Sequence, residues 1–215
     1  MTTTKLIARF TSTAILGGLA SFGRCGGPPA ASDHWQWSEP PAQRYILALA
    51  RRAFDTYATS RRVINPPSPL PAFLRRRSGV FISTMRGGAP RTCMGTLYPT
   101  QPNLAEEIIE SAVASAGRDR RFRPVQIKEL QELTLIVSIV GTPRPISAAD
   151  AGTLDPARDG LVVKYGDRYG GVLSGETPHR ENMLAWGRIR AGAGPGAVVE
   201  LFQIHDVRFM ESEYK

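Results

Sequence analysis

The sequence predicts an α+β fold, in which helices flank a mixed or antiparallel β-sheet. Three observations predict it. Residues 79–97 and 161–173 each read as a β-hairpin, two runs of strand-forming residues around a short glycine-containing turn. Residues 133–140, Leu-Thr-Leu-Ile-Val-Ser-Ile-Val, are apolar on both faces, which is typical of a central strand. Two stretches that begin near residues 40 and 104 place apolar residues at helical spacing.

Length and charge restrict the classes of protein that fit. The chain has 215 residues, enough for one substantial core or two small lobes. Its net charge is +8, but residues 1–77 hold 11 basic and 3 acidic residues, whereas the rest of the chain holds 16 of each. The predicted globular body is therefore neutral and carries no recognisable nucleic-acid-binding motif. Arg75-Arg76-Arg77 reads as a solvated edge before a strand rather than as a phosphate-binding patch.

Residues 1–38 form a basic tail ahead of the domain predicted for residues 39–215. Lys5 and Arg9 precede a short apolar stretch, residues 10–22, and a Gly/Pro-rich linker follows. A basic start with a short apolar centre is typical of an export signal, while a tail that does not fold or a wrongly assigned start explains it equally. The stretch is too short for a membrane span, and no other segment is apolar enough for one. These alternatives imply different cellular compartments, and the sequence does not choose between them.

The first helix is expected to begin near Pro40 and Pro41, because prolines suit the first helical turn. A buried stripe follows at helical spacing: Ile46, Leu49, Ala50, Ala53, Phe54 and Tyr57. The helix is expected to end before Asn65-Pro66-Pro67.

The first hairpin pairs a strand over residues 79–85 with a strand that carries Cys93, across a turn at residues 86–89. The next helix is expected to begin at Asn103, since Asn103 followed by Glu106 is a helix-start signature. Four elements follow the central strand: a polar loop over residues 141–158, a hairpin that turns at Gly166-Asp167, a helix over 176–190, and a last strand over 198–207.

Cys93 gives the clearest chemical signal of the chain. Side chains alternate along a strand, so Arg91, Cys93 and Gly95 are expected to share one face. A cation beside a thiol favours the thiolate, which is the reactive form of cysteine. The stretch therefore marks a candidate site.

Two interpretations of Cys93 follow from its own chemistry. Cysteine is among the most buried residue types, so Cys93 fits a small thiol that packs the hairpin against a helix. An enzyme would use Cys93 as a nucleophile or covalent carrier, with His179 or His205 as the candidate base.

A third interpretation is a binding module without catalysis. Arg91, Arg121 and Arg158 would recognise an anionic small ligand or an acidic group of a partner, because guanidinium groups pair with carboxylates and phosphates. Asp119 would lie in the same cleft if the helix before it packs beside the hairpin.

The sequence predicts neither a metal site nor a cofactor. The three histidines are far apart, and no pair of His or Cys residues has metal-ligand spacing. Gly192, Gly194 and Gly196 follow a helix rather than a strand, which does not favour a nucleotide site. The other cysteine, Cys25, lies in the Gly/Pro-rich tail, so a disulfide with Cys93 is not expected.

Several motifs, in order, resemble the AMMECR1 family. The family's Leu-Arg-Gly-Cys-Ile-Gly appears here as Pro90-Arg91-Thr92-Cys93-Met94-Gly95. Its Asp-x-Arg-Phe segment matches Asp119-Arg120-Arg121-Phe122, and its Asp-Pro-x-Arg-Asp-Gly segment matches Asp155-Pro156-Ala157-Arg158-Asp159-Gly160. Its Glu-Leu and Val-Ser strand matches Glu132-Leu133 through Val137-Ser138. With the opening helix, the resemblance covers the chain from Pro41 onward.

The resemblance implies a fold of two subdomains with the cysteine motif near a cleft between them. The binding residues would then be Arg91, Gly95, Asp119, Arg121 and Arg158. It also implies a cytoplasmic location and partners of the Memo and radical-SAM types. It implies no reaction, because the family has no settled biochemical activity.

Three departures from the family pattern bear on the candidate site. Thr92 replaces a glycine, which adds a side chain next to Cys93. Leu173-Ser174-Gly175-Glu176 stands where relatives commonly carry Leu-Pro-Gln-Val, and Arg188 stands near the position of a second cysteine. Whether these changes disable the site stays open.

Overall fold

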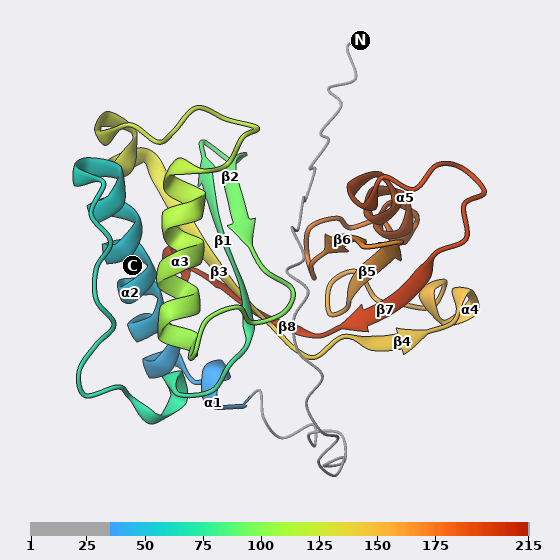
Figure 1. Ribbon diagram of the computed structural model, residues 1–215, viewed down its shortest axis with the longest axis horizontal. Coiled ribbons are helices and arrows are strands. Elements are labelled where there is room, and N and C mark those ends of the chain that lie inside the picture. Colours follow the sequence, from blue (N-terminus) through green and yellow to red (C-terminus); the bar gives the residue numbers. More distant parts are fainter. Residues whose placement is uncertain (1–34, 215) are drawn as a thin grey trace.

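The protein folds into two lobes, each built on a four-stranded antiparallel sheet (Figure 1). A computed structural model describes residues 35–214. The strand orders are β2-β1-β3-β8 in the first sheet and β4-β7-β5-β6 in the second. The predicted α+β fold of helices and antiparallel sheets in two subdomains is confirmed.

The first lobe packs its helices on one face of its sheet. Its elements are α1 (Trp35–Ser38), α2 (Pro40–Ser60), η1 (Ala72–Leu74), β1 (Gly79–Arg86), β2 (Ala89–Gly95), α3 (Leu104–Gly117), η2 (Ile127–Glu132), β3 (Leu133–Val140), β8 (Asp206–Met210) and η3 (Glu211–Tyr214). The core lies between α2, α3 and the sheet, and includes Phe54, Ile108 and Phe209. The run predicted as a central strand is β3, and it lies between β1 and β8 as expected.

The second lobe contains the other sheet and one long helix. Its elements are β4 (Arg144–Ile146), α4 (Ala148–Ala151), β5 (Gly160–Tyr165), β6 (Arg168–Val172), α5 (Arg180–Ala191) and β7 (Glu200–Ile204). Val163, Met183 and Leu201 lie in its core.

Local signals place the helix ends. Pro40 and Pro41 occupy the first turn of α2, and Arg61 ends it in the left-handed conformation at φ 58°. The Asn103 side chain caps α3 by accepting a hydrogen bond from the Glu106 backbone N–H at 3.0 Å, as predicted.

Three sequence expectations are wrong in detail. The helix expected from residue 176 begins at Arg180, because Gly175 has a positive φ of 69° and Pro178 disfavours a helical residue before it. The loop expected over residues 141–158 contains β4 and α4. The single last strand is two strands, β7 and β8, which belong to different sheets.

The chain passes between the sheets twice, after β3 and at His205. The His205 carbonyl accepts a hydrogen bond from the Gly141 N–H at 2.8 Å, so the two crossings are joined. The facing surfaces of the sheets share a small core that includes Phe81, Val140, Leu173 and Ile204, and Cys93 packs against it. The cysteine motif therefore lies where the two lobes meet.

The folded part reaches back beyond residue 39. Trp37 is buried in the core of the first lobe, and its indole N–H donates to the Phe73 carbonyl at 2.8 Å. The signal-like stretch, Cys25 and most of the predicted tail lie outside the described residues. Within residues 35–214, no helix has the length and hydropathy that a membrane crossing needs. In the same range, no three His, Cys, Asp or Glu side chains gather as metal ligands would.

Candidate functional site

Arg91 lies in a β-bulge of the first hairpin. Thr84 pairs with Thr92, whereas Met85 pairs with Pro90, so Arg91 is the extra residue and the expected alternation of Arg91 and Cys93 is interrupted. The Arg91 guanidinium binds Glu129, with both N···O distances at 3.1 Å. This carboxylate, rather than the thiol, holds Arg91.

Asp119 and Arg121 hold the backbone of Cys93 between them. The Cys93 N–H donates to Asp119 Oδ2 at 2.9 Å, and Arg121 Nη2 donates to the Cys93 carbonyl at 2.6 Å. Because β2 is an edge strand, these two side chains satisfy backbone groups that a further strand would otherwise take. Burial alone would raise the pKa of Asp119, but the hydrogen bonds and charge of Arg121, with the Cys93 N–H, lower it.

The Cys93 thiol faces the second lobe and is partly buried. Burial raises its pKa above the usual value, and the negative charge of Glu176 raises it further. Ser83, Arg121 and Arg190 act in the opposite direction without outweighing them. The environment therefore favours the neutral thiol, which is a weak nucleophile.

Glu176 and Arg190 bring a second ion pair to the same junction. Arg190 Nη1 lies 2.6 Å from Glu176 Oε2 and also donates to the Gly171 carbonyl on β6. No sequence signal distinguished Arg190, an arginine in the last turn of α5. One sequence signal could have pointed to Glu176, because this residue stands in the segment 173–176 that departs from the family pattern.

Thr92 points away from Cys93, toward α3. Its hydroxyl lies 2.7 Å from the hydroxyl of Thr84 and 2.7 Å from that of Ser115, and all three residues are buried. The side chain that replaces the family's glycine therefore fills space on the helical face of the sheet and leaves the Cys93 face unchanged.

Gly95 and Arg158 have different environments from the one expected. A Cβ on Gly95 would lie 2.0 Å from the Val80 carbonyl oxygen, so the close approach of β1 requires this glycine. Arg158 is exposed on the loop before β5 in the second lobe. That loop touches the segment of Glu176, since the Gly175 N–H donates to the Pro156 carbonyl at 2.7 Å.

Neither candidate base has a contact that ties it to the thiol. His179 is exposed near Glu181, and His205 is exposed at 3.4 Å from Asp159. Ser83, Arg121, Glu176 and Arg190 act on the thiol, and Asp119 binds the Cys93 backbone. With Cys93, these five residues form what we call the junction cluster.

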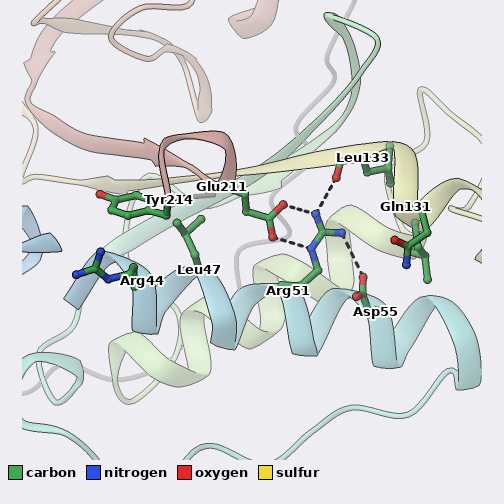
Figure 2. A pocket seen from close by; sticks show the side chains of 9 residues that line it. Arg44, Leu47, Arg51, Asp55, Gln131, Leu133, Glu211 and Tyr214 are labelled. Carbon is green, nitrogen blue, oxygen red and sulfur yellow. Dashed lines mark hydrogen bonds and ion pairs between the residues drawn. The ribbon is translucent and has the colours of Figure 1, made fainter. Parts of the chain in front are cut away.

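A groove of about 400 Å³ lies on the helical side of the first lobe, among α2, η2 and η3 (Figure 2). Arg51 crosses it and donates to Glu211 Oε1 at 2.7 Å and to the Leu133 carbonyl at 2.8 Å. Asp55 lies on the other side of the guanidinium at 3.4 Å. Arg51 on α2 thus joins β3 through Leu133 and η3 through Glu211. Because its acidic partners belong to the same chain, we interpret this ion-pair group as one that stabilises the lobe.

Known proteins resemble this chain along both lobes. A family model described as AMMECR1 matches residues 47–209. Protein TK0174 of Thermococcus kodakarensis is 35% identical over 173 residues, which cover 74% of this chain and 81% of that protein. A protein of Thermotoga maritima is 39% identical over 126 residues, which cover 58% of this chain and 71% of that protein. The crystal structure of uncharacterized protein PH0010 from Pyrococcus horikoshii matches with a TM-score of 0.72 at 30% identity, over 82% of this chain and 92% of that one.

Proposed function

The chain belongs to the AMMECR1 family, and from this membership we propose that it is a binding protein whose junction cluster receives an anionic group. That group belongs to a small ligand or to a protein partner. No covalent chemistry is assigned to Cys93, which would contact the ligand as a neutral thiol.

The observation that carries this proposal is the set of free N–H donors at the junction. Arg121 uses Nε and Nη2 for Asp119 and Cys93, and within residues 35–214 its Nη1 has no acceptor. Arg190 uses Nη1, and its Nε and Nη2 likewise have no acceptor in the described chain. Both guanidiniums lie near enough to Cys93 for their charges to oppose the net rise in the pKa of its thiol. Guanidiniums with unused N–H groups suit a carboxylate or a phosphate.

The other predicted site residues have supporting roles in this proposal. Asp119 orients Arg121, while Arg91 and Gly95 fix the hairpin. Arg158 lies on the loop whose Pro156 carbonyl accepts from the Gly175 N–H, and in this proposal it supplies a further cation.

Binding is tested by titrating inorganic phosphate and glutarate into the full-length protein while backbone amide signals are followed by NMR. We expect the signals of Cys93 and Gly171 to shift, and Arg190→Met to weaken binding by about tenfold, the usual effect of losing a charged hydrogen bond. Arg120→Met removes the same charge from an exposed neighbour of Arg121 and serves as the control. If Arg190→Met binds phosphate and glutarate as tightly as the wild type, the assignment of the anion site to Arg190 fails. Arg158→Met tests in the same way whether Arg158 contributes to binding.

The pH dependence of Cys93 alkylation separates binding from cysteine catalysis. In the Cys25→Ser protein, only Cys93 can react. We expect the rate to rise with pH beyond the ordinary thiol range, because burial and Glu176 raise the thiol pKa. A plateau well below that range would show a stabilised thiolate and would favour an enzyme.

The partners that the family resemblance implies are proteins of the Memo and radical-SAM types. An acidic group on such a partner would occupy the same donors. Mixing the purified protein with a Memo-type protein from the same genome, followed by gel filtration, tests this. A complex that Arg190→Met weakens and Arg120→Met does not would support the partner.

A further inference from the structure

The two arginines of the junction cluster are held by carboxylates of very different accessibility. The Asp119 side chain is 3% exposed and accepts from the Cys93 N–H, the Arg121 N–H and the Arg121 guanidinium. The Glu176 side chain is 19% exposed, and its one hydrogen-bond donor in the described chain is Arg190 Nη1. Asp119 is therefore a fixed part of the fold, whereas Glu176 is held by a single contact.

Arg190 stays in place without Glu176. Its Nη1 donates to the Gly171 carbonyl on the edge strand β6, and its guanidinium lies over the Trp186 ring at 5.8 Å from the centroid. Both contacts come from elements other than the segment that carries Glu176. The guanidinium would thus keep its position if the carboxylate left.

The backbone of Glu176 is anchored independently of its side chain. Its N–H donates to the Leu173 carbonyl at 3.3 Å, which closes a turn with Gly175 at the position of positive φ. Ser174 and Thr177 on either side are buried. A rotation of the Glu176 side chain alone would therefore free the Nη1 hydrogen of Arg190 that Glu176 now holds, beside the unused Nε and Nη2, with no movement of the backbone.

We propose that Glu176 is a displaceable internal ligand, and that a carboxylate of the bound molecule takes its place on Arg190. This inference rests on the function proposed above and narrows its ligand to the carboxylate class. The guanidinium already holds a carboxylate, so the exchange keeps its charge neutralised and releases Glu176 to water.

The proposal predicts that Glu176 opposes binding. Glu176→Gln removes the competing charge but retains a side chain of equal size that accepts from Arg190. We expect it to bind glutarate about threefold to fivefold more tightly, the scale of a partly exposed ion pair. Glu181→Gln, an exposed carboxylate at the start of α5, is the matched control and should leave the affinity unchanged. An acetylated tetraglutamate peptide, compared with glutarate, distinguishes an acidic partner from a small acid.

A second readout needs no ligand. Glu176 raises the pKa of the Cys93 thiol, so in the Cys25→Ser background Glu176→Gln should speed alkylation at a fixed pH below that pKa, and Glu181→Gln should not. Glu176→Ala provides the same test without a residual hydrogen bond.

The outcomes separate the two proposals. If the wild type and Glu176→Gln bind glutarate equally, Glu176 is not displaced and this inference fails, while the anion site stands. If phosphate binds but neither carboxylate probe does, the carboxylate class is wrong. If none of the proteins binds any probe, both proposals fail.

Discussion

Asp119 shows how one carboxylate can define a site without acting in it. It pairs with Arg121 and also holds the Cys93 N–H, so it fixes both the guanidinium and the edge strand. The sequence identified Asp119 and Arg121 because they lie in a recognisable motif. It did not select Arg190 and marked Glu176 only as a departure from the family pattern, since their approach to Cys93 depends on how the two lobes meet.

Asp119→Asn is expected to lower the free energy of unfolding by about 1–3 kcal/mol at neutral pH, because a buried charge-assisted pair is lost. The pKa of Asp119 is lowered in the folded protein, so its stabilisation is present above the unfolded pKa of about 4 and disappears as the pH falls through the lower folded pKa. Urea unfolding from pH 7 down to about pH 3 should therefore show the wild type and the variant converging. Asp167→Asn, on the exposed turn of the second hairpin, is the control. A constant difference across this range would contradict the assignment.

At the scale of elements, local signals succeeded where a helix or strand completes its own pattern. The prolines that begin α2, the Asn103 cap of α3 and the uniform run of β3 agree with the prediction from the sequence, whereas Tyr57 at the end of the α2 stripe is only half-buried. The strands β7 and β8 were merged because one apolar pattern runs through both, and only His205 separates them. Whether β7 and β8 join the same sheet depends on tertiary pairing, which the alternation of apolar residues along the chain does not indicate.

The first element also moves the domain boundary. We propose that the folded unit includes residues 35–38, because Trp37 is buried and bonded to Phe73. A chain that starts at Glu39 should unfold with a free energy about 3–5 kcal/mol below that of a chain that starts at Trp35, the usual cost of deleting a core tryptophan. Thermal or urea unfolding of the two chains measures this. Equal stabilities would restore the boundary at residue 39.

At the scale of the whole molecule, the sequence predicted the fold class and the lobes but not the balance of charge at their junction. The expectation of a reactive thiolate rested on Arg91, yet a bulge and Glu129 hold that arginine. The thiol instead experiences burial and Glu176, which oppose ionisation. The residues next to Cys93 in the sequence therefore did not predict the charges that surround its thiol.

The order of strands in the first sheet has a consequence for synthesis of the chain. Its fourth strand, β8, follows the entire second lobe in the sequence, so β3 keeps an open edge while residues 141–205 are being translated. At typical elongation rates this lasts roughly 3–13 seconds, far longer than a hairpin needs to form. The apolar strand β3 is exposed to wrong pairing throughout that interval.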